Sequence, residues 1–294
     1  MRIKSSERIL EGIVFICAAL TVVAVALITI FIFGKGMPAM METGPLSFIG
    51  GKEWSPGNGE YGILPLIVGT LSVTLGSLII GVPLGVGCAV FLAEMPNKKQ
   101  AGFLKAAIEL LAGIPSVVYG FFGMIVLVPV IRQVAKFVNP DSDITGFSIL
   151  AGAIILAIMI MPTIVSMSVN AIQAVPQEYR EGSLAIGADR RETITKVIVP
   201  AAKSGIFSSI VLAMGRSIGE TMAVLMVTGN MAVMPTGPTS SVATMTGTIA
   251  MEMSYATPSH QSALFAIGIV LFLIIVVLNG CAQAIMRKLG GANA

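Results

Sequence analysis

Six long apolar stretches constrain the fold of this chain more than any other feature of its sequence. They occupy residues 9–33, 63–93, 106–131, 148–171, 204–229 and 263–286. A helix needs about 20 apolar residues to cross the hydrocarbon core of a bilayer, and each stretch reaches that length. Only 11% of the 294 residues are charged, whereas soluble domains contain about 25%. We therefore expect an all-α, polytopic membrane protein with six transmembrane helices in a lipid bilayer.

The distribution of lysine and arginine predicts how these helices are oriented. Thirteen of the 18 basic residues fall before the first stretch, after the last, or in the connections that follow the second and fourth stretches. Four fall on the other side: Lys35, Lys52, Arg132 and Lys136. Because cytoplasmic segments are enriched in lysine and arginine, both termini are predicted to face the cytoplasm. The remaining basic residue, Arg216, lies inside the fifth stretch.

The apolar stretches divide the chain into three parts. Residues 1–62 hold the first helix, which is too long for a signal-peptide core of about 7–15 residues, and an external loop rich in glycine and proline. Residues 63–286 form a core of five further helices, and residues 287–294 form a cytoplasmic tail. The last external connection, 230–262, has no lysine or arginine. A short helix is expected within it, at 242–255.

Glycine and proline interrupt three of the apolar stretches. The second contains Pro83 and several glycines, the third contains "AGIPSVVYGFFG" with Pro115, and the fourth contains "MIMPT" with Pro162. Inside lipid, backbone groups freed by a helix break must be satisfied by protein or by water in a cavity, so broken helices tend to line pathways. Glycine and proline also serve tight packing and kinks in membrane helices. The sequence leaves both interpretations open.

The long loop between the fourth and fifth stretches, residues 172–203, is predicted to form two short helices. The first begins near Pro176, a favoured first helical position, and ends before Gly187, which suits a C-terminal cap. The second begins at Asp189, and Glu192 three residues later completes the pattern of a capping box. Pro200 is expected to stop or bend this second helix. Such a charged, structured loop either docks on another protein or folds back on its own membrane domain.

Within this loop, Glu181, Gly187 and Pro200 have the spacing of the EAA loop of ABC-transporter permeases, E-A-A-x3-G-x9-I-x-L-P. The sequence departs from that pattern at four positions, Gly182, Ser183, Val197 and Val199. The resemblance implies that the loop contains a coupling helix, which sits in a groove on an ATP-binding subunit. We assign this coupling to Glu181, Gly187 and Pro200, and to Asp189 as the cap of the second helix.

Two further stretches resemble a narrower family. "IELLAGIPSVVYGFFG" (108–123) and "GRSIGETMAVLMVTGN" (215–230) are similar to the permease subunits of the bacterial and archaeal phosphate-specific ABC importer, and "GETMAV" resembles the PstC-type subunit. This resemblance covers nearly the whole chain and implies a type I ABC importer permease fold in the cytoplasmic membrane. The partners that it implies are a homologous PstA-type permease, two copies of a cytoplasmic ATP-binding subunit, an external phosphate-binding protein, and phosphate. ATP and Mg²⁺ would be used by the ATP-binding subunit, and this chain would bind no cofactor.

Arg216 and Glu220 are the charged residues within the fifth stretch. A charged side chain at the centre of a bilayer costs about 2.5 to 3.5 kcal/mol on insertion scales, so such residues pair or reach water. Four positions apart on a continuous helix, the two lie on one face and can form an ion pair. We hypothesise that Arg216 contacts a passing phosphate through its planar guanidinium, while Glu220 keeps the anion from binding too tightly. The alternative is a structural pair that locks helices together or bridges to a partner subunit.

Three hydroxyl side chains near these motifs are secondary candidates for the substrate pathway: Ser116, Ser217 and Thr221. Ser217 and Thr221 lie beside the charged residues, and their hydroxyls are able to hydrogen-bond an anion. Ser116 follows Pro115, where the backbone N–H groups of a newly started helix would face an anion. The alternative for each hydroxyl is a hydrogen bond to a backbone carbonyl of its own helix.

Several function classes have no support in the sequence. "GKG" and "GKE" in the first external loop are not the G-x4-G-K-[ST] loop of an ATPase, so energy would have to come from a partner. The lone His260, and Cys17, Cys88 and Cys281 in apolar runs, suit neither a metal site nor a disulfide framework. No catalytic triad is evident, and a net charge of +3 gives no basic cluster for nucleic acid. Three alternatives stay open: a permease for another oxyanion such as sulfate or molybdate, an ion-gradient-driven secondary anion transporter, and a structural membrane anchor.

Overall fold

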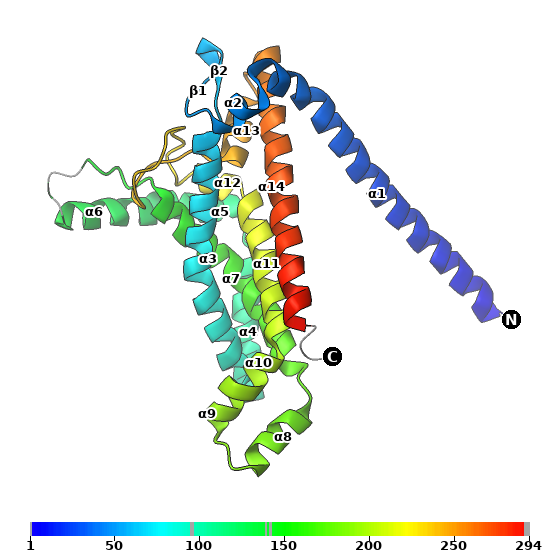
Figure 1. The fold of residues 1–294 in the computed structure, drawn as a ribbon. Helices are drawn as coiled ribbons and strands as arrows, with labels where there is room; N and C mark the ends of the chain where they lie inside the picture. The colour runs from blue at the N-terminus through cyan, green and yellow to red at the C-terminus, as the bar shows by residue number, and fades with distance from the viewer. Residues whose placement is uncertain (1, 95–96, 139, 141–142, 291–294) are drawn as a thin grey trace.

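The computed structural model describes residues 2–94, 97–138, 140 and 143–290. Its long helices are α1 (Arg2–Thr43), α3 (Leu64–Ala93), α7 (Ile149–Gln173), α11 (Lys203–Gly219) and α14 (Pro258–Gly290). In the described part of the chain, five segments are long and apolar enough to cross a membrane, and α11 completes a sixth together with the bent segment before it. Figure 1 shows α3, α7, α11 and α14 packed as a bundle. The expected all-α membrane architecture is confirmed, with one small hairpin added.

The most extensive helix contact in the bundle is between α3 and α7. A glycine makes the close approach possible, because a Cβ atom at Gly76 would lie only 2.8 Å from the Cβ of Ala153. Small residues let helix backbones approach closely in membranes, where packing and hydrogen bonds hold helices together. Pro83 and Pro162 lie inside helices that continue past them. In the second and fourth stretches, glycine therefore serves packing, and neither proline breaks its helix.

The third stretch departs from the expected spans. It contains, in order, α4 (Lys98–Ala112), α5 (Ser116–Phe122), the π-helical turn η2 (Gly123–Leu127) and α6 (Val128–Val138). The break at Pro115, one of the two alternatives that the sequence left open, is present, and the candidate span lies at Ser116–Val138 in place of 106–131. Pro115 has no N–H and a fixed φ, so it stands at the N-cap of α5 and does not continue α4. In Figure 1, α6 extends sideways from the bundle and does not run along α3.

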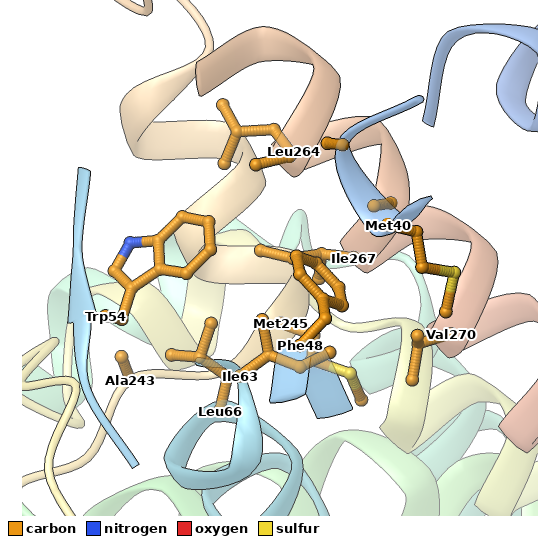
Figure 2. Close-up of a cluster of buried hydrophobic side chains, with 13 residues drawn as sticks. Met40, Phe48, Trp54, Ile63, Leu66, Ala243, Met245, Leu264, Ile267 and Val270 are labelled. Atoms are coloured by element: carbon orange, nitrogen blue, oxygen red, sulfur yellow. The ribbon is translucent and has the colours of Figure 1, made fainter. Parts of the chain in front are cut away.

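One end of the bundle carries the hairpin, and we call it the hairpin end. β1 (Trp54–Ser55) and β2 (Glu60–Tyr61) pair antiparallel around η1 (Pro56–Asn58), after the short helix α2 (Pro45–Gly50). Nearby lies α13 (Met245–Glu252), which confirms the short helix expected within 242–255. The buried apolar side chains at this end form the hairpin-end cluster (Figure 2): Ala39, Met40, Phe48, Trp54, Ile63, Leu66, Ala243, Met245, Ala263, Leu264, Ala266, Ile267 and Val270.

Helix α1 is longer than the expected span at 9–33 and joins the bundle near its C-terminal end. Phe31 packs edge-on against Phe265 of α14, with ring centroids 5.5 Å apart, and Gly36 lies against the α14 backbone at Ala266. Residues 10–28 are exposed in the isolated chain, and Figure 1 shows α1 splayed away from α14. An apolar helix surface of this size needs lipid or another membrane protein to cover it.

The opposite end of the bundle carries the 172–203 loop, and we call it the loop end. The loop contains α8 (Gln177–Ala185), α9 (Arg190–Glu192), the π-helical turn η3 (Thr193–Ile198) and α10 (Val199–Ala201). In Figure 1, α1 begins and α14 ends toward this same end of the molecule. The helices of the bundle therefore run between the hairpin end and the loop end.

Candidate functional site

The fifth stretch breaks at Glu220, in the middle of "GRSIGETMAV". α11 ends at Gly219, Glu220 has extended backbone with φ −68° and ψ 134°, and α12 (Met222–Leu225) begins two residues later. The Glu220 carboxylate accepts a hydrogen bond from the N–H of Ala223 (3.3 Å), and its carbonyl accepts one from the hydroxyl of Thr246 (2.9 Å). A break inside a membrane segment needs such partners for its freed backbone groups. The single helix expected over 204–229 is therefore wrong.

Arg216 stands in the last turn of α11 and does not pair with Glu220. The break turns Glu220 out of the helical register, and no ion pair within 4.0 Å joins these two residues. The expected pair across one helical turn is wrong for this reason. Arg216 lies 13 residues after Lys203 (216 − 203), about 20 Å along the helix. Its side chain is exposed in the isolated chain.

Ser217 and Glu220 line a small pocket at the break that is rich in hydroxyl groups. Ser217 is buried, and its Oγ lies 2.9 Å from the Oγ of Ser77 on α3. In this conformation the pocket is too narrow to hold a phosphate. Its other polar lining residues are four threonines, Thr70, Thr74, Thr244 and Thr246. Sequence reasoning missed these four, because they come from α3 and from the segment around the start of α13, and no local pattern connects them.

The two other predicted hydroxyls lie outside the pocket lining. Thr221 donates to the carbonyl of Gly219 (3.3 Å), which is the local hydrogen bonding named as its alternative. Ser116 is the first residue of α5 and directly follows the break at Pro115. α5 in turn packs on α12, since a Cβ atom at Gly120 would lie 3.0 Å from the Cα of Ala223. The two stretches that carry the narrower resemblance therefore meet at the break.

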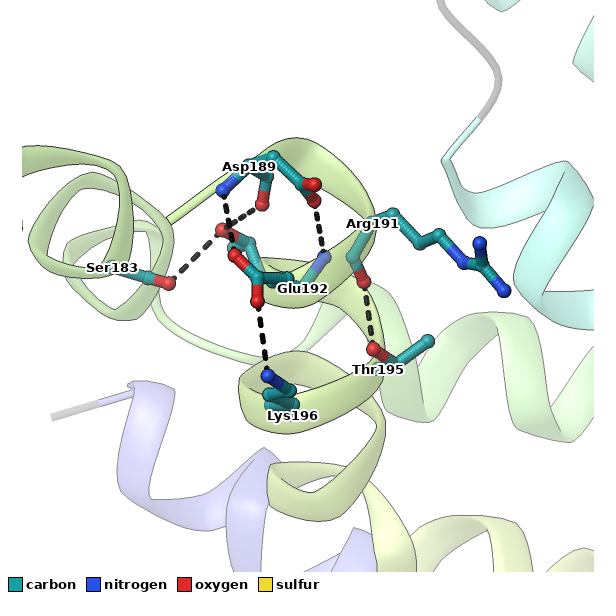
Figure 3. Close-up of polar contacts among 7 residues, drawn as sticks. Ser183, Asp189, Arg191, Glu192, Thr195 and Lys196 are labelled. Atoms are coloured by element: carbon teal, nitrogen blue, oxygen red, sulfur yellow. Dashed lines mark hydrogen bonds and ion pairs between the residues drawn. The ribbon is translucent and has the colours of Figure 1, made fainter. Parts of the chain in front are cut away.

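The 172–203 loop is folded by its own caps, as predicted. α8 follows Pro176, and Gly187 comes directly after its C-cap residue, Ile186, with a left-handed φ of 90°, which favours glycine. Asp189 accepts the N–H of Glu192 (2.7 Å), and Glu192 accepts the N–H of Asp189 (3.3 Å), so the capping box is confirmed (Figure 3). The hydrogen bond from Lys196, with that from the Asp189 backbone, holds the pKa of Glu192 below its usual range.

The second loop helix bends just after Pro200, as predicted. The segment Arg190–Ala201 meets α11 at an angle of 64°. Ile198 on this segment is fully buried against α3 and α7, so one side of the loop folds back on the membrane domain. Three apolar side chains on α8 and directly after it stay exposed: Tyr179, Leu184 and Ile186. The residues assigned to coupling are exposed as well: Glu181, Gly187, Asp189 and Pro200.

Sequence reasoning missed Glu94, which joins the loop to α3. Glu94 is the C-cap of α3, and its carboxylate faces Arg180 of α8, with Oε1 at 2.6 Å from Nη2 and Oε2 at 2.8 Å from Nη1. Arg190 at the start of α9 donates to the Glu94 carbonyl. A usable signal was the position of Glu94, because a carboxylate at a helix C-terminus is unfavourable unless a cation compensates it.

Glu252 and His260 form a polar contact at the hairpin end that sequence reasoning also missed. Glu252 accepts a hydrogen bond from the indole N–H of Trp54 (3.1 Å), and its Oε2 lies 2.7 Å from Nε2 of His260. His260 is only 7% exposed. Across the described residues, no group of three or more His, Cys, Asp or Glu side chains is arranged to hold a metal ion. The histidine instead ties the start of α14 to α13 and the hairpin.

Comparison with known proteins gives a family for this architecture. Residues 81–291 match the family described as binding-protein-dependent transport system inner membrane component. The chain is 42% identical over 265 residues to the probable ABC transporter permease protein YqgH of Bacillus subtilis (strain 168), an alignment covering 88% of this chain and 84% of that protein. It is 32% identical over 289 residues to the phosphate transport system permease protein PstC of Mesorhizobium japonicum, covering 92% of this chain and 87% of that protein.

A solved structure has the same fold. The structure is that of a bacterial alginate ABC transporter in complex with an alginate pentasaccharide-bound periplasmic protein. One of its chains matches this chain with a TM-score of 0.62 and 15% sequence identity. The match covers 93% of this chain and 94% of that chain. The type I ABC importer permease fold that the sequence resemblance implied is confirmed. The chain is a multi-pass component of membrane transport, and it belongs to the family of binding-protein-dependent transport system inner membrane components.

Proposed function

We propose that this chain is the membrane-spanning permease subunit of an ATP-driven phosphate importer and shares its pathway with a homologous PstA-type subunit. The observation that carries the proposal concerns Arg216. Its side chain is exposed in the isolated chain at a point about 20 Å along an apolar helix, and the break turns Glu220 away from it. Relatives named as phosphate permeases along most of the chain support phosphate as the substrate.

Arg216 would meet phosphate at the junction between the two permeases. Its guanidinium is planar and always charged, and its parallel N–H groups match two phosphate oxygens. Glu220 would act by ending α11 beside Arg216, because its carboxylate caps α12 and does not neutralise the arginine within this chain. Since conduction requires that an ion also leaves, the negative charge of Glu220 would limit how tightly phosphate is held.

Ser116, Ser217 and Thr221 would complete the polar lining once the break opens. In the present conformation Ser217 is bonded to Ser77, and the pocket is too narrow for phosphate. We therefore propose that α3 and α11 move apart during transport. The N–H groups at the start of α5, beside Ser116, would then add a positive dipole end to the pathway.

Energy would come from two copies of an ATP-binding subunit, which use ATP and Mg²⁺ at the loop end. In this proposal the loop end and both termini face the cytoplasm, and the hairpin end faces outward from the cytoplasmic membrane of a bacterium or archaeon. The exposed apolar side chains near Glu181 and Gly187 supply the docking surface. An external phosphate-binding protein would deliver substrate at the hairpin end, and the alginate transporter structure likewise contains a periplasmic protein.

The proposal is tested by phosphate uptake into vesicles that contain the assembled complex with Arg216→Gln. The uptake rate per complex should fall by about 10-fold or more, because a hydrogen bond to a charged group is worth about 1.5–3 kcal/mol. Arg132→Gln is the matched control, since Arg132 is an exposed arginine on α6, away from the break. Uptake at the wild-type rate by an assembled Arg216→Gln complex would contradict the proposal.

A second candidate is a permease for another oxyanion, such as sulfate or molybdate. A guanidinium presents the same two parallel donors to any tetrahedral oxyanion, and the name of YqgH specifies no substrate. Inhibition of phosphate uptake by a modest excess of either oxyanion would favour this candidate. Uptake that continues without ATP and stops with a proton uncoupler would instead indicate an ion-gradient-driven transporter.

A further inference from the structure

Helix α3 connects the 172–203 loop with the pocket at the break. It is continuous over 30 residues, a length of about 45 Å. Near its middle, Ser77 shares a buried hydrogen bond with Ser217 of α11. One end lies at the pocket, where the Thr70 hydroxyl accepts the N–H of Met245 (2.9 Å), and the other end lies at Glu94 beside the loop. A displacement of α3 would therefore act directly on the pocket.

Glu94 ends this helix with a contact that local preferences disfavour. A carboxylate at a helix C-terminus faces the negative end of the helix dipole. The side chains of Glu94 and Arg180 are only 11% and 26% exposed, and two short contacts join them. Oε1 of Glu94 is buried, and among the described residues its polar contact is with the guanidinium of Arg180. Removing either side chain leaves a largely buried charge uncompensated, so each holds the other in place.

The same glutamate reaches both helical parts of the loop. Arg180 belongs to α8, whereas Arg190, which donates to the Glu94 carbonyl, begins α9. Beside these contacts, Leu92 near the end of α3 belongs to the same apolar cluster as Ile198 of the loop. The loop and the final turn of α3 are thus joined by charge, by a backbone hydrogen bond and by packing.

We propose that Glu94 is a positioning residue that makes α3 follow the 172–203 loop, so that a displacement of the loop reaches Ser217 and the break beside Arg216. α11 follows the loop through the chain itself, across the 64° bend after Ala201. Both helices that carry the Ser77–Ser217 bond are then attached to the loop, α11 covalently and α3 through Glu94 and Arg180. The inference rests on the proposed function for the identity of the docking subunit and of the substrate.

The test compares Glu94→Gln, Arg180→Gln and the double variant in complexes assembled with the partner permease and the ATP-binding subunits. The quantity measured is phosphate taken up per ATP hydrolysed, for equal amounts of assembled complex. Each single variant should lower this ratio by about 5-fold or more, within the usual range of coupling between sites. The double variant should be no worse than the more severe single one, because both changes remove the same contact.

Two further variants separate a positioning role from simple stabilisation of the fold. Glu109→Gln changes an acid on α4 whose contact with Lys105 is long (4.0 Å) and exposed, and it should keep the wild-type ratio. Arg180→Lys keeps the charge but loses the bidentate geometry, so it should assemble and show an intermediate ratio. A role confined to folding would lower the amount of assembled complex and leave the ratio unchanged in every variant, which would overturn the inference.

A second readout does not depend on the substrate. A cysteine at position 222, the exposed first residue of α12 (Met222→Cys, with Cys17, Cys88 and Cys281 changed to alanine), is labelled by a small thiol reagent with and without ATP. We expect ATP to change the labelling rate, and Glu94→Gln to abolish that change. An ATP effect on labelling without phosphate uptake would contradict the proposed function and support the inference. Three results would overturn the inference. The labelling rate would be the same with and without ATP, the Glu94→Gln complex would label and transport like the wild type, or the losses of the two single variants would multiply in the double variant.

Discussion

The two ends of α3 are held in different ways. At the hairpin end, Ile63 and Leu66 are fully buried in the hairpin-end cluster, which also draws on α1, α2, β1, α13 and α14 (Figure 2). At the loop end, α3 is held by Glu94 and by a smaller apolar cluster, in which Ala89 and Leu92 pack against α7 and against Ile198 of the loop. Much of the adjoining loop is exposed, including its capping box (Figure 3).

This difference indicates which end moves. Burial in a cluster that joins six elements makes the hairpin end part of the stable core, whereas the loop depends on local caps, a few polar contacts and the packing of one side through Ile198. Segments with few buried apolar contacts open at lower free energy than core segments do. The molecule therefore has a fixed frame at the hairpin end and a movable part at the loop end, as expected if a docked subunit drives transport.

The largest contrast should come from shortening one leucine at each end. Leu264 is fully buried in the hairpin-end cluster, so Leu264→Ala should lower the free energy of unfolding by about 2–5 kcal/mol. Leu184 in the loop is 52% exposed, so Leu184→Ala should change it by no more than about 0.5 kcal/mol. Thermal unfolding of the purified variants measures both, and equal losses would break the comparison.

A smaller loss is expected from the polar contact at the hairpin end. Glu252→Ala leaves the indole N–H of Trp54 and the ring of His260 without their partner, at a cost of about 1–3 kcal/mol. Glu42→Ala is the control, since Glu42 is an exposed acid near the C-terminal end of α1 that takes no part in this contact. If thermal unfolding showed the same midpoint for both variants, the contacts of Glu252 with Trp54 and His260 would not stabilise the hairpin end.

The cap of the second loop helix should contribute only locally. Asp189→Ala removes the side chain that accepts the Glu192 N–H, at a cost of about 1 kcal/mol. Asp189→Asn should keep most of this stability, because asparagine caps nearly as well. Hydrogen exchange at Glu192 and Thr193 should accelerate in the alanine variant, while the hairpin-end cluster keeps its protection. Faster exchange at both ends would mean that they unfold as one unit.

The smallest effect is an opposite response of the two ends to acid. The charge of Glu53 raises the pKa of Glu60 in the hairpin, so this repulsion destabilises the folded hairpin at neutral pH and is relieved as pH falls through the raised pKa. Hydrogen bonding from Lys196 lowers the pKa of Glu192, so its stabilisation is present above the usual glutamate pKa and is lost as pH falls through the lowered one. NMR titration of labelled glutamates should show Glu60 protonating before Glu192 on acidification. The reverse order would remove this contrast.

Much of the fold followed from local signals in the sequence. The second apolar stretch, 63–93, became α3 at Leu64–Ala93, because it holds no charged residue and the polar residues on either side mark both helix ends. The capping box of Asp189 and Glu192 was predictable since it joins residues only three positions apart.

The errors lie where a distant segment decides the outcome. Apolar character continues through Glu220, but the break there is stabilised by Thr246, 26 positions away. Glu94 and Arg180 are separated by 86 positions, and Trp54 and Glu252 by 198, so neither pair leaves a local pattern. Glu94 was visible as a polar group at the end of an apolar stretch, but its partner was not.

In the function proposed above, Arg216 is kept inside an apolar helix because it meets a passing oxyanion. The most direct measurement is a structure of the complete complex, with the partner permease, in which phosphate is trapped by an ATP-bound state of the ATP-binding subunits. We predict that the Arg216 guanidinium faces a cavity at the junction of the two permeases, within hydrogen-bonding distance of the phosphate. A guanidinium that points into lipid, or is sealed in dry packing while phosphate lies elsewhere, would contradict the account.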